Sequence, residues 1–61
     1  MLEKVAIITG AASGIGYLTA ERFAMRGIRV ALMDVNPDTV EAAAEKIRQQ
    51  GGCADAYTTV A

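Results

Sequence analysis

The chain has 61 residues, 52% of them hydrophobic, and its six basic and seven acidic side chains give a net charge of −1. A chain this short forms one small unit at most, because a domain of about 60 residues buries only about 60% of the surface of its unfolded form. Its single cysteine cannot form an internal disulfide, and without histidine it has no Cys/His cluster for zinc. Its charges lack the Lys/Arg clusters typical of nucleic-acid binding. We therefore expect neither a nucleic-acid partner nor a metal site.

The first expected element is a strand at residues 5–8, where apolar residues follow one another without interruption. Such a run is typical of a strand buried on both faces, as in a parallel sheet covered by helices. The run is too short for the core of a signal peptide and far too short to span a bilayer. Because Met1 leads almost directly into this strand, we expect a cytoplasmic protein with no membrane partner.

A glycine-rich turn joins this strand to a segment with helical periodicity. Glycines occupy positions 10, 14 and 16 of the turn. Glycine can adopt positive φ and lets a ligand approach the main chain, because it has no Cβ. The first turn of a helix adds unpaired N–H groups and the positive end of a dipole, which favour an anion. The turn therefore predicts a site that holds a diphosphate with the backbone.

A helix and a second strand are expected to follow. One face of the helix carries mainly small residues at helical spacing, which would let it pack close to the sheet: Gly16, Ala20, Phe23, Ala24 and Gly27. The apolar run at residues 30–33 predicts the second buried strand, which ends at Asp34, 20 residues beyond Gly14. An acid at this place would accept hydrogen bonds from the ribose hydroxyls of a dinucleotide.

The second helix has a clear start. Asn36 is a good N-cap, Pro37 suits the first helical position, and Asp38 lies in the first turn. The apolar stripe of this helix consists of Val40, Ala43, Ala44 and Ile47. Glycines at 51 and 52 end the helix, and residues 54–60 predict a third strand in which Tyr57 packs against a helix.

This order of elements would leave one face of the sheet uncovered. Right-handed crossovers that step in one direction place both helices on the same face. The opposite face would then expose half of each apolar run, and the first strand would lack its next neighbour. An apolar surface of this size normally marks a region that something else covers. We therefore expect the chain to be the N-terminal part of a larger domain, with a true start at Met1 and a continuation past Ala61.

The motif Thr9-Gly10-x-x-x-Gly14-Ile15-Gly16 resembles the cofactor signature of the short-chain dehydrogenase/reductase family. The resemblance extends over nearly the whole chain. It implies an α/β fold of the Rossmann type, βαβαβ, with three parallel strands and two helices as the N-terminal part of a larger doubly wound domain. It also implies an NAD-dependent oxidoreductase that transfers hydride between nicotinamide and an alcohol or carbonyl substrate, commonly as a homo-oligomer.

The resemblance implies a role for each residue of the turn. Gly10 would permit the tight bend after the strand. Ser13 and the backbone of Ile15 would hydrogen-bond the pyrophosphate and the nearby ribose. Gly14 would allow the phosphates to approach closely, and Gly16 would allow the helix to pack on the sheet.

Asp34 completes the cofactor-binding set that the resemblance implies, by holding the adenosine ribose. Its negative charge would repel the additional 2′-phosphate of NADP. An enzyme that prefers NADP would usually carry Arg or Lys beside the glycine turn or after the second strand. Ala11, Ala12 and Val35 occupy those places, and Arg29 lies at the opposite end of the strand. NAD is therefore the expected cofactor.

The catalytic residues of the family have no match in this chain. The family uses a Tyr-x-x-x-Lys pair with an upstream serine for proton transfer. Tyr17 is followed at that spacing by Glu21 and Tyr57 by Ala61, so neither fits. The family also often carries an aspartate after the third strand, and no acid occurs at residues 59–61. We expect this chain to contain no catalytic residue and to be inactive alone.

Alternative interpretations stay open at this point. The chain could be a non-catalytic dinucleotide-binding module or a truncated remnant. A Rossmann-like site for a flavin dinucleotide or S-adenosylmethionine is a further alternative, although flavin sites are expected to show Gly-x-Gly-x-x-Gly. A phosphate-loop NTPase is excluded, because no Gly-Lys-Ser/Thr follows the turn. Ser13 could serve as a helix cap, and Asp34 could be a solvated acid at a strand end.

Overall fold

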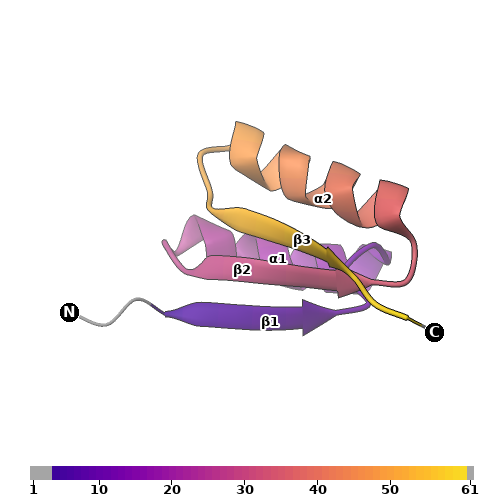
Figure 1. Ribbon diagram of the computed structural model, residues 1–61. Helices are drawn as coiled ribbons and strands as arrows, with labels where there is room; N and C mark the ends of the chain where they lie inside the picture. The colour runs from indigo at the N-terminus through magenta and orange to yellow at the C-terminus, as the bar shows by residue number, and fades with distance from the viewer. Residues whose placement is uncertain (1–3, 61) are drawn as a thin grey trace.

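Strands and helices alternate along the chain, in a computed structural model that describes residues 4–60. The elements are β1 (Val5–Thr9), α1 (Gly14–Met25), β2 (Arg29–Asp34), α2 (Pro37–Gln49) and β3 (Ala54–Thr58). The three strands are parallel, and β2 lies between β1 and β3 (Figure 1). This confirms the expected Rossmann-type βαβαβ arrangement. Met1 and Ala61, on which the expectations about the chain ends depend, lie outside the described residues.

One face of the sheet packs against both helices. Ile8 of β1 is in register with Leu32 of β2, which is in register with Ala56 of β3. Side chains at alternating strand positions share a face, so this row and the row through Val30 point toward the helices. The buried helix residues that meet them are Ala20, Ala24, Val40, Ala43, Ala44 and Ile47. The stripe expected for the second helix is therefore confirmed.

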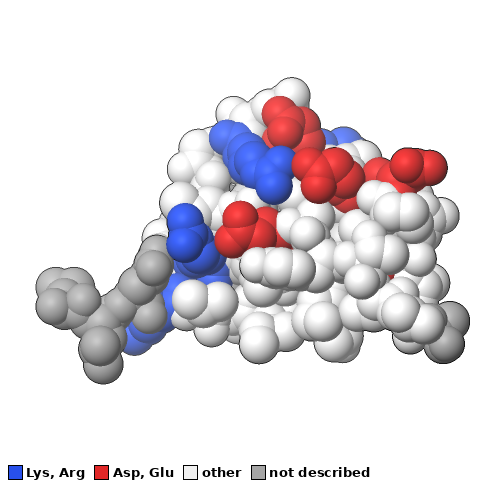
Figure 2. All heavy atoms as spheres, viewed as in Figure 1, with Lys and Arg blue, Asp and Glu red and all other residues white. Residues whose placement is uncertain are grey.

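Within the described part of the chain, no helix covers the opposite face of the sheet. Val5 is 54% exposed and Ile7 is 67% exposed, whereas Leu32 on the covered face is fully buried. In Figure 1, α1 lies behind the strands, so the uncovered face is turned toward the viewer. Figure 2 shows that much of this face carries no charged side chain, while charges gather over α2 and near the amino ends of the strands.

The expectation that Tyr57 packs against a helix is wrong. Tyr57 is 51% exposed and is in register with Met33. Because side chains alternate along a strand, the burial of Ala54 and Ala56 toward the helices directs Tyr57 to the other face. Strand β3 is also two residues shorter than expected. The N–H of Thr59 still donates to the carbonyl oxygen of Asp34 at 2.8 Å, but β2 ends at that residue.

Helix α2 is fixed at both ends by side chains. At its start, the Asn36 carboxamide oxygen accepts hydrogen bonds from the N–H groups of Asp38 and Thr39, at 3.0 and 3.3 Å. This is the expected N-cap, with Pro37 in the first helical position. These capping bonds explain why the sequence located the start of α2 correctly.

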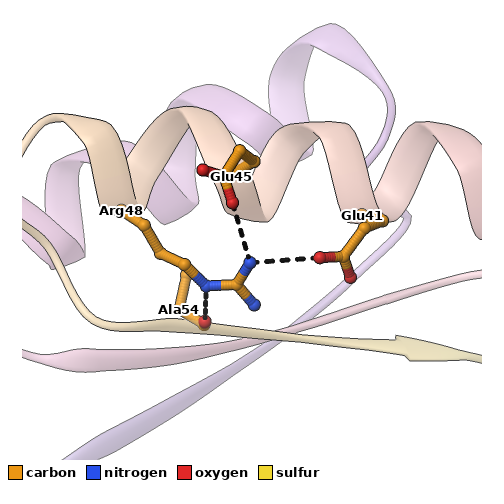
Figure 3. A network of polar contacts seen from close by, with 4 residues as sticks. All are labelled: Glu41, Glu45, Arg48 and Ala54. Atoms are coloured by element: carbon orange, nitrogen blue, oxygen red, sulfur yellow. Dashed lines mark hydrogen bonds and ion pairs between the residues drawn. The ribbon is translucent and has the colours of Figure 1, made fainter.

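Arg48 links the end of α2 to the start of β3 (Figure 3). Its Nε donates to the carbonyl oxygen of Ala54 at 2.9 Å. Its Nη1 donates to carboxylate oxygens of Glu41 and Glu45, at 3.1 and 3.3 Å. The hydrogen bond to Glu41 is the main cause that raises the pKa of Arg48 above its ordinary value. One guanidinium therefore joins two turns of helix to the neighbouring strand.

Candidate cofactor-binding site

The candidate site lies where β1 ends and α1 begins. Gly10 follows β1 directly and has a φ of +64°, in the left-handed region that favours glycine. The N–H of Ser13 donates to the carbonyl oxygen of Gly10 at 3.1 Å, which closes a tight turn. This conformation is what the sequence predicted for Gly10.

Gly16 and Gly14 meet different surroundings. A Cβ on Gly16 would collide with the carbonyl oxygen of Gly10 and lie 3.1 Å from the Cα of Ala11. Gly16 is therefore needed where the first turn of α1 crosses the preceding loop. A Cβ on Gly14 would have no atom within 4 Å. Folding alone therefore gives no steric reason for glycine at position 14.

Ser13 is the N-cap of α1. Its backbone is extended, with φ −76° and ψ 159°, and its Oγ accepts a hydrogen bond from the N–H of Gly16 at 3.3 Å. The same hydroxyl donates to the carbonyl oxygen of Gly10 at 2.7 Å. Capping was one of the two roles considered for Ser13, and the hydroxyl retains acceptor capacity beyond these bonds.

Asp34 closes the site from the end of β2. Its Oδ2 accepts a hydrogen bond from the N–H of Ala12 at 2.9 Å. Its Oδ1 accepts from the N–H of Val35 at 2.7 Å and from that of Asn36 at 3.4 Å. The bond from Ala12 is the main cause that lowers the pKa of the Asp34 carboxyl below its ordinary value, and partial burial opposes it. The structure thus brings Asp34 against the glycine turn, as the sequence predicted for a shared site.

The contact between Asp34 and Ala12 was not found from the sequence. Ala12 contributes a backbone N–H, so its side-chain identity carries no signal for the bond. The bond joins residues 22 positions apart, at the ends of adjacent strands. The rule that carboxyl ends of parallel strands meet at one sheet edge is the signal that could have indicated it.

The main-chain donors of the turn divide into two groups. The N–H of Ala11 donates to the carbonyl oxygen of Met33 at 3.2 Å, and those of Ala12, Ser13 and Gly16 have the partners given above. Within residues 4–60, the N–H groups at positions 14 and 15 have no hydrogen-bond acceptor. Both belong to the first turn of α1, where the helix dipole favours an anion. The arrangement can therefore accept negatively charged oxygens from a ligand.

A groove of about 280 Å³ runs from this turn toward α2, between Ser13 and Gly14 on one side and Lys46 on the other. Tyr17 lies in it, with its hydroxyl donating to Glu21 at 3.4 Å and its ring centroid 5.8 Å from the Lys46 Nζ. Partial burial, followed by the negative charge of Glu21, raises the pKa of the Tyr17 hydroxyl. Tyr17 therefore keeps its proton more firmly than a free tyrosine does. A catalytic tyrosine beside a lysine shows the opposite effect, because the positive charge lowers its pKa.

Neither helix of the described residues 4–60 is long and apolar enough to cross a membrane.

Comparisons with known proteins agree with this geometry. The family model described as short chain dehydrogenase matches residues 4–60. The uncharacterised oxidoreductase YxbG of Bacillus subtilis (strain 168) is 50% identical over 55 residues, which cover 90% of this chain and 20% of that protein. The chain therefore spans about a fifth of the length of this curated relative.

Solved structures show the same fold with either cofactor. A short chain dehydrogenase/reductase from Burkholderia phymatum in complex with NAD has 34% identity and a TM-score of 0.88, over 95% of this chain and 21% of that one. A metagenomic short-chain oxidoreductase in complex with NADP has 32% identity and a TM-score of 0.89, over 93% of this chain and 26% of that one. The glycine turn, the parallel sheet and these matches lead to one conclusion: the chain belongs to the short chain dehydrogenase family.

Proposed function

We propose that the chain is the NAD-binding part of an oxidoreductase that transfers hydride between nicotinamide and an alcohol or carbonyl substrate. The observation that carries this proposal is that two N–H groups, those of Gly14 and Ile15, have no acceptor among residues 4–60, in a turn whose Ala12 N–H donates to Asp34. The named activity of YxbG as an oxidoreductase and the bound NAD of the Burkholderia phymatum enzyme support it.

The pyrophosphate of the cofactor would lie at the start of α1. The N–H groups of Gly14 and Ile15 would donate to its oxygens, and the 83% exposure of Ile15 within residues 4–60 is consistent with an open approach. The open space beside Gly14 would let the phosphates come close to the main chain. Ser13 would add its hydroxyl, while Gly10 and Gly16 shape the turn.

Asp34 would hold the adenosine ribose and select NAD over NADP. Three N–H groups favour the ionised carboxylate, so the residue carries its negative charge at neutral pH. A 2′-phosphate placed beside this charge would be repelled. No Lys or Arg follows directly after β2, where Val35 and Asn36 stand. This charge balance supports NAD.

The remaining parts of the reaction belong outside this chain. The nicotinamide supplies or accepts the hydride, and the proton-transfer residues would lie beyond residues 1–61 in a larger doubly wound domain. The uncovered apolar face with Val5, Ile7 and Tyr57 supports such a domain. The cytoplasmic location and the homo-oligomeric state stay predictions.

Binding measurements on the 61-residue chain and its Asp34→Ala variant test the cofactor choice. We expect the chain to bind NAD more tightly than NADP. The variant should bind NAD about tenfold more weakly, and the difference between its affinities for NAD and NADP should be smaller. Asp38→Ala is the matched control, because it removes an acid from the start of α2 without touching the turn. If the unaltered chain and Asp34→Ala each bound NAD and NADP with equal affinity, Asp34 would have no role in the cofactor site. Oxidation of any alcohol with NAD by the chain alone would contradict the placement of the catalytic residues elsewhere.

A further inference from the structure

We propose that Asp34 is a positioning residue for the phosphate-binding turn, in addition to its proposed contact with the ribose. By holding the N–H of Ala12, its carboxylate would set the direction in which two later amides of the turn, those of Gly14 and Ile15, face the pyrophosphate. The inference rests on the proposed function and deepens it. It gives Asp34, the residue proposed to bind the ribose of the cofactor, a second role at the phosphates.

The first half of the turn is attached to the end of β2 at two points. The N–H of Ala11 donates to the carbonyl oxygen of Met33 at 3.2 Å, and the N–H of Ala12 donates to Asp34 Oδ2 at 2.9 Å. Ala11 is fully buried, so the first attachment is independent of side-chain chemistry at the surface. The second attachment depends on the Asp34 side chain alone and is the one that a substitution can remove.

The carboxylate itself is held in a fixed orientation. While Oδ2 accepts from Ala12, Oδ1 accepts from Val35 at 2.7 Å and from Asn36 at 3.4 Å. A carboxylate has about four lone-pair sites, and three N–H donors occupy three of them. One group can therefore hold the turn and still accept a hydrogen bond from a ribose hydroxyl.

Positioning and simple electrostatics predict opposite effects on a phosphate ligand. Removal of a negative charge near the turn should strengthen the binding of an anion if Asp34 acts only through its charge. If Asp34 positions the turn, loss of the acceptor should weaken binding although the repelling charge is gone. Asp34→Asn removes the charge and keeps one carbonyl acceptor, which serves Ala12 when the NH2 group lies toward Val35 and Asn36, whereas Asp34→Ala removes the charge and both acceptors.

Inorganic pyrophosphate is the suitable probe, because it has no ribose. Its affinity is measured at fixed pH from the amide resonances of Gly14 and Ile15 in the ¹⁵N-labelled chain. We expect Asp34→Ala to bind pyrophosphate about 3- to 10-fold more weakly than Asp34→Asn, as loss of one hydrogen bond predicts. Equal affinity of the two variants, or tighter binding by Asp34→Ala, would overturn the inference.

A titration of the unaltered chain covers the case in which Asp34→Ala fails to fold. Within residues 4–60, the pKa of this carboxyl depends on three amides and on partial burial, with no contribution from a charged side chain. We expect the Ala12 N–H resonance to follow the protonation of Asp34. If it does not, while NAD still shifts Gly14 and Ile15, the inference fails and the proposed function stands. If neither NAD nor pyrophosphate shifts those amides in the unaltered chain, the proposed function is overturned, and the role at the phosphates with it.

Discussion

Two of the three glycines with positive φ within residues 4–60 lie in turns that use their main-chain donors differently. Gly10 before α1 has a φ of +64°, and Gly51 after α2 has a φ of +93°. In the second turn, the N–H groups of Gly51 and Gly52 donate to carbonyl oxygens of α2 at 3.0 Å each. In the first, two amides at the start of α1 have no acceptor within residues 4–60. Glycine with positive φ therefore does not by itself indicate a binding turn, and the proposed site depends on the two unpaired donors at the start of α1.

The two turns also differ in what surrounds their closely packed glycine. A Cβ on Gly16 would meet the backbone of Gly10, whereas a Cβ on Gly52 would first meet two side chains, Ile47 Cγ2 at 2.8 Å and Ala24 Cβ at 3.0 Å, and then the Ile47 carbonyl oxygen at 3.3 Å. Backbone atoms in a hydrogen-bonded turn move less easily than side chains. Four measurements test this contrast.

The largest effect is expected for Gly16→Ala. The new methyl group would collide with the Gly10 carbonyl oxygen, so the turn and the start of α1 must separate. We expect a loss of about 3 kcal/mol in the free energy of unfolding, toward the upper end of what overpacking causes. Urea denaturation followed by circular dichroism measures it. An unchanged urea midpoint would show that the turn can move to admit the methyl group. The two turns would then not differ in their tolerance of a Cβ.

Gly52→Ala should have an intermediate effect on folding and none on binding. Ile47 is buried and must shift to admit the methyl group, so we expect a loss of about 1–2 kcal/mol in the free energy of unfolding. The affinity of the folded variant for NAD should equal that of the unaltered chain, because the N–H groups of Gly51 and Gly52 already donate to carbonyl oxygens of α2. If fully folded Gly52→Ala bound NAD more weakly than the unaltered chain, the second turn would have a role in the site.

Gly14→Ala should show the reverse profile. The free energy of unfolding should stay within about 0.5 kcal/mol, because the methyl group enters open space at the start of a helix. NAD affinity should fall about tenfold, equal to about 1.4 kcal/mol, because the methyl group occupies the proposed approach of the phosphates. Parallel calorimetric titration of Gly14→Ala and Gly52→Ala provides the matched pair. Full NAD affinity in Gly14→Ala would place the phosphates elsewhere.

The smallest effect concerns the pH dependence of stability. Because the folded-state pKa of Asp34 is lowered, its contribution is fully present above the unfolded pKa of about 3.9 and is lost as pH falls through the folded value. We expect no contribution from Asp34 to the stability change between pH 7 and 5, and a decline below about pH 4. Asp34→Asn should lack this decline, as thermal denaturation across the acid range can show. Identical acid profiles of the two chains would mean that the three amides do not stabilise the carboxylate.

Much of the fold could be predicted from local signals in the sequence. Two apolar runs located β1 and β2, and Asn36 with Pro37 located the start of α2, because these signals act within a few residues of themselves. Tyr57 lies on the face opposite the expected one, because the alternation set by the buried Ala54 and the half-buried Ala56 directs it away from the helices. The end of β3 depends on where its partner β2 stops, which is not encoded in β3 itself.

The candidate site was predictable in part for the same reason. The glycine turn and the helix cap at Ser13 are local, and the sequence indicated both. The bond between Ala12 and Asp34 depends on the pairing of β1 with β2, which brings the two strand ends together. Cofactor binding by these residues stays a prediction that the measurements above address.

The central position of β2 has a consequence for the precision of the site. Both edges of β2 are hydrogen bonded, to β1 and to β3, whereas each of those strands has one neighbour within residues 4–60. Segments with the most protected hydrogen bonds open least often, so the amides of β2 should exchange with solvent most slowly. Asp34 ends this strand, and the turn before α1 is attached to it. The turn is therefore attached to the strand whose hydrogen bonds are expected to open least often, which should help it to keep its shape.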